Sequence, residues 1–204
     1  MFTGIIQTVG KLLARRDHGG DCTLTIAPGA LAQDSIGLGD SIAVNGVCLT
    51  VISQTDGAID FDVSGETLGL TTLGNLQVGD PLNLETAATP STALGGHIVS
   101  GHVDGLATIK SIEPDARSQR ITIEVPRTLS RYLAAKGSVC VDGVSLTING
   151  VGDDVFDVNI VPHTMSATNF GSYEPDTRVN LEVDVIARYV ERLIEARGNA
   201  ADDV

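Results

Sequence analysis

The side chains of this sequence that could do chemistry occur in pairs 97 positions apart. Cys48 corresponds to Ser145, and both side chains can act as nucleophiles or hydrogen-bonding groups. His102, which could transfer protons near neutral pH, corresponds to the apolar Ile5. The remaining polar pairs are Asn45/Asp142, Glu66/His163, Thr50/Thr147 and Thr67/Thr164. Copies that differ at polar positions suggest two related sites with different tasks.

These residues also have structural interpretations. Asn45-Gly46 and Asp142-Gly143 are strong signals for a tight two-residue hairpin, whatever else their side chains do. Cys48 and Ser145 follow these turns, where a small residue can simply fill the interior of a barrel. The occurrence of both pairs at equivalent places strengthens the catalytic interpretation without excluding the structural one.

Standard cofactor and metal motifs are absent from the sequence, which has no P-loop, no GxGxxG, no HExxH and no GxSxG elbow. His97 and His102 could pair as metal ligands, but no third Cys, His or carboxylate lies at a suitable spacing. We therefore predict neither a metal site nor a bound cofactor.

The pairs belong to an internal repeat that runs through most of the chain. Residues 39–51, GDSIAVNGVCLTV, align without gaps on residues 136–148, KGSVCVDGVSLTI. The same shift aligns residues 3–4 with 100–101 and residues 82–85 with 179–182. The tripeptide FDV at Phe61 and Phe156 is shifted by 95 instead, which predicts two extra residues in a loop within residues 159–162 of the second copy.

The elements that must position these residues are strands, because apolar and polar residues alternate with period two at Cys22, Leu24 and Ile26 and in their counterparts. Further strands are expected at residues 41–44, 47–53 and 58–63, with short helices near residues 29–33, 67–73 and 128–135. Many short strands with Gly-rich turns predict an all-β chain with a small closed antiparallel barrel in each half. The expected domains are residues 1–97, 98–184 and a tail at 185–204.

The tail differs from the rest because its apolar residues recur at helical spacing from residue 185 onward. This pattern predicts one amphipathic helix without a counterpart after the first half. Its apolar stripe must pack either against another subunit or against its own barrel, and both possibilities remain open at this point.

Charge and cysteine content argue against some partners and locations. The formal charge of −13 argues against binding to nucleic acid or to an anionic membrane surface. Three widely spaced cysteines suit a reducing, cytoplasmic location better than a disulfide framework, and neither a signal peptide nor a transmembrane segment is expected.

Together these segments resemble the riboflavin synthases of the alpha-chain type. The resemblance rests on MFTGII, the pair NGVCLTV and DGVSLTI, GGHIVSGHVDG, VPHTMSATNFGS and VNLEVDVIARYVERL, and it covers nearly the whole chain. It implies two tandem six-stranded Greek-key barrels with a C-terminal helix, assembled as a homotrimer whose active site lies between subunits. It also implies a cofactor-free reaction in which two molecules of 6,7-dimethyl-8-ribityllumazine exchange a four-carbon unit, and it leaves association with a lumazine synthase open.

The resemblance also assigns residues to the site. It implies catalytic roles for His102, Ser145, Cys48 and Asp142. It implies substrate contacts, beyond Cys48, His102 and Ser145, from Gly4, Ile5, Ile6, Leu49, Thr50, Asp62, Val63, Ser64, Gly65, Glu66, Thr67, Gly101, Val103, Lys136, Leu146, Thr147, Val161, Pro162, His163, Thr164, Met165, Ser166 and Asp184. His163 departs from the family, in which many members have Glu.

Two other functions remain possible. Related lumazine-binding proteins use the same tandem barrels to hold lumazine or flavin without catalysis, as antenna or storage proteins. The retention of His102, Asp142, Ser145 and Thr147 in the second copy favours the enzyme. A flavin-dependent reductase is disfavoured, because the chain lacks a nicotinamide-binding α/β domain.

Overall fold

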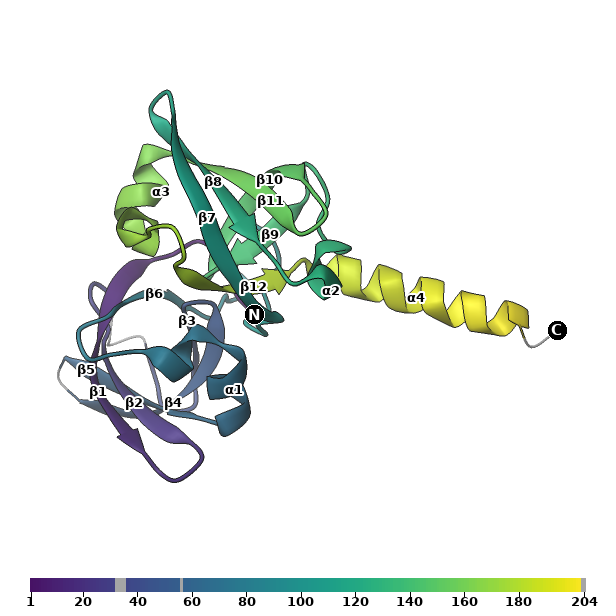
Figure 1. The fold of residues 1–204 in the computed structure, drawn as a ribbon. Coiled ribbons are helices and arrows are strands. Elements are labelled where there is room, and N and C mark those ends of the chain that lie inside the picture. The colour runs from purple at the N-terminus through teal and green to yellow at the C-terminus, as the bar shows by residue number, and fades with distance from the viewer. Residues whose placement is uncertain (32–35, 56, 203–204) are drawn as a thin grey trace.

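Two β-barrels lie against each other, and a single long helix projects away from the second barrel (Figure 1). This computed structural model describes residues 1–31, 36–55 and 57–202, with residues 198–202 described by their backbone alone. No helix among the described residues is long and apolar enough to cross a membrane.

The first barrel closes in the strand order β1-β2-β5-β4-β3-β6, and every pair of neighbours is antiparallel. Its strands are β1 (Thr8–Asp17), β2 (Cys22–Ala27), β3 (Ser41–Val44), β4 (Val47–Thr55), β5 (Ala58–Val63) and β6 (Pro81–Thr86). The Asn45-Gly46 turn between β3 and β4 has positive φ at both residues, as the predicted tight hairpin requires.

The second barrel repeats this order. Its strands are β7 (Gly105–Asp115), β8 (Ser118–Glu124), β9 (Ser138–Val141), β10 (Val144–Val151), β11 (Val155–Ile160) and β12 (Arg178–Val183). Asp142-Gly143 forms the equivalent hairpin turn, again with positive φ at both residues. The prediction of an all-β chain with two six-stranded barrels and a C-terminal helix is therefore confirmed.

The two copies keep one register throughout, so the predicted two-residue slip is wrong. Ile59 pairs with Ile26, and Phe156 pairs with Ile123, one repeat later on equivalent strands. Phe156 therefore corresponds to Ile59, and Phe61 to Val158. The two FDV tripeptides occupy different positions of the same strand, because a buried phenylalanine fits at either inward position. The β-bulges also recur in register, between Val51 and Ser53 and between Ile148 and Gly150.

The short helices were predicted only in part. The segment predicted at 67–73 forms α1 (Gly65–Leu70) and leads into the 3-10 helix η2 (Thr72–Asn75). Their counterparts α3 (Pro162–Ala167) and η3 (Asn169–Ser172) were not predicted, although the repeat places them there. The segment at 128–135 shortens to α2 (Arg127–Ser130), and residues 32–33 of the segment at 29–33 lie outside the described residues.

The barrels meet around a pseudo-twofold axis at which the two hairpin turns touch. A Cβ atom built on Gly46 would lie 2.6 Å from the backbone nitrogen of Gly143, so only glycine permits this approach. Two buried asparagines cross the interface reciprocally: the Asn83 side-chain amide donates to the Asp142 carbonyl at 2.9 Å, and that of Asn180 donates to the Asn45 carbonyl at 2.8 Å. These pairs fix the orientation of one barrel on the other.

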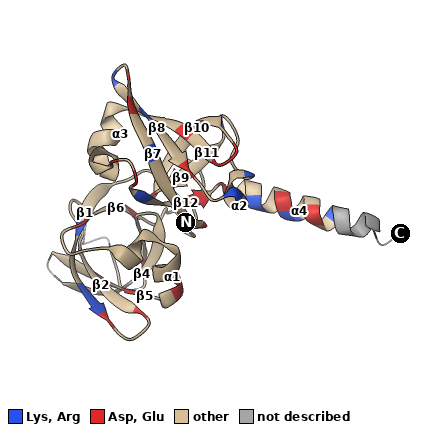
Figure 2. Cartoon of the chain, in the orientation of Figure 1, with Lys and Arg blue, Asp and Glu red and all other residues tan. Residues whose placement is uncertain are grey.

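The tail forms α4 (Val185–Asp202), and its apolar face is exposed. Arg131 and Tyr132, next to α2, contact Glu191 on α4 by an ion pair and a hydrogen bond. The exposed apolar residues are Ile186, Tyr189, Val190, Leu193 and Ile194. Figure 2 shows basic and acidic residues alternating along the helix beside them. Val190 and Ile194 line a groove with Tyr132 and Leu133, but most of the stripe stays exposed in the single chain.

Candidate functional site

Each barrel is capped by a segment that belongs to the other half of the chain. The Ser145 backbone N–H, in the second barrel, donates to the Gly4 carbonyl at 2.8 Å, and the Cys48 N–H, in the first barrel, donates to the Gly101 carbonyl at 2.9 Å. Ile6 packs against the core of the second barrel, and Val103 packs against that of the first. Cys48 therefore faces residues 100–103, and Ser145 faces residues 3–6, each from the opposite half of the chain. We call these two stretches the crossed segments. The sequence did not reveal this exchange.

Close packing explains the glycines in these segments. A Cβ on Gly4 would lie 2.5 Å from Cβ of Ser145, and one on Gly101 would lie 2.6 Å from Cβ of Cys48. Both glycines also have positive φ, of 76° and 80°. No other residue type combines this conformation with so close an approach.

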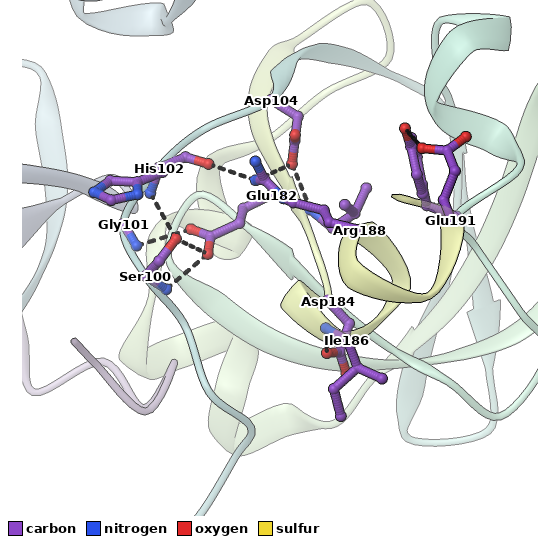
Figure 3. Close-up of polar contacts among 11 residues, drawn as sticks. Ser100, Gly101, His102, Asp104, Glu182, Asp184, Ile186, Arg188 and Glu191 are labelled. Carbon is purple, nitrogen blue, oxygen red and sulfur yellow. Dashed lines mark hydrogen bonds and ion pairs between the residues drawn. The ribbon is translucent and has the colours of Figure 1, made fainter. Parts of the chain in front are cut away.

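Two buried glutamates hold the crossed segments in place. Glu85 accepts hydrogen bonds from the Thr3 N–H at 2.7 Å and the Gly4 N–H at 3.0 Å. Glu182 does the same for Ser100 and Gly101, at 2.7 and 2.9 Å (Figure 3). Burial raises the pKa of both carboxyl groups, and the hydrogen bonds oppose this effect. The sequence analysis missed both as site residues, although the repeated NLE motif contains them.

The first-barrel patch is the outward-facing polar surface that lies beside Gly101 and Val103. Thr50 and Asp62 flank Val51 and Phe61, which pair across β4 and β5, so their exposed side chains leave the sheet next to each other. The predicted residues on these elements are Cys48, Leu49, Thr50, Asp62, Val63, Ser64, Gly65, Glu66 and Thr67. Ser64 caps α1 by accepting from the Thr67 N–H, and Leu49 and Val63 are buried in the barrel core.

The second-barrel patch is the equivalent surface beside Gly4, Ile5 and Ile6. Thr147 and Asn159 flank the pair Ile148 and Val158, so Asn159 is the counterpart of Asp62. Asn159 was not among the predicted site residues, because the predicted two-residue slip gave this strand the wrong register. The predicted residues on these elements are Ser145, Leu146, Thr147, Val161, Pro162, His163, Thr164, Met165 and Ser166. Met165 packs towards the barrel core, and Ser166 donates to the His163 carbonyl.

Among the described residues, a histidine and a serine form a pair in the second-barrel patch and not in the first. His97 Nδ1 lies 2.6 Å from Ser145 Oγ. Residues 97–99 run antiparallel to Phe2 and Thr3, as the Phe2–Val99 bridge shows, and this pairing brings His97 to the site. Burial lowers the pKa of His97, which favours the neutral imidazole. His97 was expected only as a possible metal ligand, because its distance of 48 residues from Ser145 gives no signal of contact.

His102 is exposed next to the first-barrel patch and is tied to the C-terminal helix. Its carbonyl accepts from Arg188 at 3.0 Å, and Arg188 also pairs with Asp104 at 2.8 Å (Figure 3). Asp184 accepts from the Ile186 N–H at the start of α4, and Lys136 is exposed in a turn with positive φ. No described contact brings Lys136 to the two patches, whereas the charge of Asp184 acts on His97 in the second-barrel patch and opposes the lowering of the His97 pKa by burial.

Asp142 belongs to the inter-barrel network instead of a patch. Its carboxyl group accepts from the Tyr173 hydroxyl at 2.5 Å and from the Asn180 N–H at 2.8 Å, and the residue is 2% exposed. Burial raises its pKa from 3.8 to about 7. Its counterpart Asn45 accepts from the Asn83 N–H in the same way, at 2.7 Å. This geometry favours an anchoring role for Asp142 over the predicted catalytic role.

Comparison with known proteins agrees with this architecture. The lumazine binding domain matches residues 3–87 and 100–184. The riboflavin synthase of Photobacterium phosphoreum is 45% identical over 194 residues, covering 95% of this chain and 89% of the relative. That of Mycobacterium bovis is 46% identical over 202 residues, covering 97% and 100%, and that of Bacillus subtilis is 41% identical over 194 residues, covering 95% and 90%.

Solved structures show the same fold. LumP in complex with riboflavin superposes with a TM-score of 0.84 at 27% identity, covering 90% of this chain and 99% of LumP. LumP in complex with 6,7-dimethyl-8-(1'-D-ribityl) lumazine superposes with a TM-score of 0.81 at 26% identity and the same coverage. Two lumazine-binding domains in tandem and extensive identity to riboflavin synthases place this chain in the riboflavin synthase family.

Proposed function

We propose that the protein is a riboflavin synthase, a transferase that converts two molecules of 6,7-dimethyl-8-ribityllumazine into riboflavin and 5-amino-6-ribitylaminouracil. The products together contain every atom of the two substrates, so the reaction needs no oxidant and no second substrate. The observation that carries the proposal is the presence of two equivalent but chemically different patches in one chain. Such a pair suits a reaction in which one compound plays two roles.

Each patch offers groups for one lumazine. Backbone groups of the crossed segments and the hydroxyls of Thr50 and Thr147 suit the polar edges of the planar ring. Exposed polar groups near the starts of α1 and α3 suit the ribityl hydroxyls, among them Asp62 and Asn159. Holding two rings together replaces a bimolecular encounter, for which effective molarities reach about 10⁵–10⁸ M.

The Ser145–His97 pair is the group best placed for proton transfer. The reaction removes a proton from the C7 methyl group of one lumazine and adds a nucleophile to C7 of the other. A neutral His97 can accept a proton through Ser145 Oγ, 2.6 Å away, and return it later. The first-barrel patch has Cys48 at the equivalent place, and among the described residues no hydrogen bond joins Cys48 to a histidine. We therefore assign the proton-transfer role to the second-barrel patch.

The active enzyme in this proposal is a homotrimer with each site between the first barrel of one subunit and the second barrel of the next. Closed head-to-tail packing supplies such a contact three times. The exposed apolar stripe of α4 supports association, because Tyr189 and Leu193 remain 69% and 67% exposed in the single chain.

Location and further assembly are also part of the proposal. Cys22, Cys48 and Cys140 are free thiols, which agrees with a cytoplasmic location. Association with a lumazine synthase rests on the family resemblance alone, and co-sedimentation of the two purified proteins would test it.

The second candidate function is non-catalytic binding of lumazine or flavin, and the similarity to LumP favours it. The two functions differ in the product formed from the lumazine. Incubation with 6,7-dimethyl-8-ribityllumazine alone should form riboflavin if the protein is the synthase. Tight binding with unchanged lumazine would instead identify a binding protein.

A further inference from the structure

A cavity of about 550 Å³ lies on the pseudo-twofold axis between the barrels, and the proposed function does not use it. Six of its lining residues come from the first half, and six lie 97 positions later. Among the predicted site residues only Asp142 lines it, whereas Cys48 and Ser145 do not. Its volume falls within the range of about 300–1,000 Å³ found for small-molecule sites.

Two buried acceptor atoms of the cavity wall lack partners among the described residues. These atoms are Asn169 Oδ1 and Thr72 Oγ1, which occupy equivalent positions of the two copies. Asn169 is only 4% exposed, and its amide nitrogen already donates to Asn45 Oδ1 at 3.0 Å and to the Pro81 carbonyl at 3.1 Å. Because an unpaired buried acceptor is unfavourable, a ligand that donates an N–H or O–H to Asn169 Oδ1 would be stabilised here.

The cavity is also polarised across the axis. Asp80 and Pro81 line it from one copy, and their counterparts Thr177 and Arg178 line it from the other. The exposed Arg178 guanidinium has no hydrogen-bond or ion-pair partner among the described residues, so it is free to donate to a ligand oxygen. The ligand should therefore carry carbonyl acceptors towards Arg178 and N–H donors towards Asn169 and Thr72.

Part of the remaining wall is apolar and includes an aromatic ring, beside the polar Asn75 and Ser172. Leu76 and Tyr173 occupy equivalent positions, with Leu106 nearby in the lining. The Tyr173 hydroxyl is held by Asp142, so its orientation is fixed. A flat ring with polar edges fits between such walls better than a flexible chain.

We propose that this cavity is a binding site for a planar cyclic amide of the pyrimidinedione class, distinct from the two patches. The ring would lie against Leu76 and Tyr173, its carbonyl oxygens would accept from Arg178, and its N–H groups would donate to Asn169 and Thr72.

Titration calorimetry of the full chain with 5,6-diaminouracil tests this site. We expect binding at one site per chain, weakened about tenfold by Arg178→Gln and about threefold to tenfold by Thr72→Val, as losses of a charged and a neutral hydrogen bond predict. Arg127→Gln removes an exposed arginine that does not line the cavity and should bind as the parent does. Thermal unfolding of each variant checks that the fold is intact.

Competition separates this site from the patches. In the parent protein, saturating 6,7-dimethyl-8-ribityllumazine should leave the diaminouracil affinity unchanged. The absence of binding at about 1 mM, equal affinity in all variants, or displacement by the lumazine would each overturn the proposal.

Discussion

At the scale of single residues, the contact between His97 Nδ1 and Ser145 Oγ distinguishes the second-barrel patch from the first. We expect Ser145→Ala and His97→Gln each to lower kcat about 10²-fold, because a positioned proton-transfer group contributes on this order. The Kd for lumazine should change less than about threefold, since the other ring contacts remain. Single-turnover kinetics and fluorescence titration measure the two quantities separately.

Ser130→Ala is the matched control for these variants, because it removes a hydroxyl on α2 whose one hydrogen bond within the described part of the chain is to the Arg127 carbonyl. It should retain parental kcat. If Ser145→Ala lost affinity and kcat in equal proportion, the pair would position the substrate without assisting proton transfer.

The pH dependence of the reaction follows from the same histidine. Burial lowers the pKa of His97 from its ordinary 6.5, so the imidazole stays neutral and able to accept a proton at pH values somewhat below 6.5. We therefore expect the acidic limb of the kcat profile to lie below pH 6.5 and to disappear in His97→Gln. An acidic limb above pH 6.5 in the parent, or one that persists in the variant, would contradict the assignment.

Stability should respond to the buried carboxyl group of Asp142. Its pKa is raised to about 7 in the folded chain, whereas the unfolded chain keeps the ordinary 3.8. Between pH 3.8 and about pH 7 the folded chain therefore binds one more proton than the unfolded chain does. The stabilisation that comes from this bound proton is lost as the pH rises towards and through 7. Asp142→Asn cannot ionise, and at pH 8 it should exceed the parent by on the order of 2–4 kcal/mol.

Urea unfolding of both proteins between pH 5 and pH 8 measures this difference. Asp153→Asn, which replaces an exposed carboxylate, serves as the control and should follow the parent. A gap between Asp142→Asn and the parent that stays constant with pH would show that Asp142 is ionised throughout this range.

Candidate residues that occupy matching positions in the two copies of the repeat could be predicted from the sequence. Cys48, Ser145 and the paired threonines follow from the alignment of two copies, and Glu85 and Glu182 could have been found from the same alignment. The His97 contact could not be found in this way, because it depends on the N-terminus pairing with the linker across the pseudo-twofold axis.

At the scale of elements, the crossed segments at residues 3–6 and 100–103 depend on glycine. Gly101→Ala places a methyl group 2.6 Å from Cβ of Cys48, in addition to the strain of a positive φ. We expect it to lower the free energy of unfolding by more than the 1–2 kcal/mol that such strain costs alone, and to weaken lumazine binding. Urea unfolding and fluorescence titration measure the two effects.

Gly79→Ala is the control that introduces backbone strain without a steric clash. Gly79 also has positive φ, but a Cβ atom there would have no other atom within 4 Å. This variant should lower the free energy of unfolding by the cost of backbone strain alone and should leave the lumazine affinity unchanged. Equal effects of the two substitutions would mean that the segment relaxes away from Cys48 without consequence for the site.

Strands and hairpin turns were predicted well, whereas register and short helices were not. Residues 41–44 and 58–63 match β3 and β5, because alternation and the Asn-Gly turn are local signals. The position of Phe156 could not be predicted from the FDV identity, because either inward position of this strand accepts a buried phenylalanine. Helix α3 was missed because six residues starting at Pro162 carry little periodicity of their own.

At the scale of the whole molecule, the apolar stripe of α4 determines assembly in this account. We expect a chain ending at Asp184, and the full chain carrying Leu193→Glu, to sediment as single subunits with activity reduced at least about tenfold, because the two patches would no longer meet. Arg192→Ala changes the charged side of the same helix and should remain assembled. Sedimentation velocity of an active monomer would contradict this part of the proposal.

The measurement that tests the central claim most directly uses the purified protein and 6,7-dimethyl-8-ribityllumazine with nothing else added. Absorbance and chromatography would follow both products over time. The account predicts one riboflavin and one 5-amino-6-ribitylaminouracil for every two lumazine molecules consumed. Stoichiometric binding of lumazine without formation of either product would contradict it and would make the protein a carrier of its ligand.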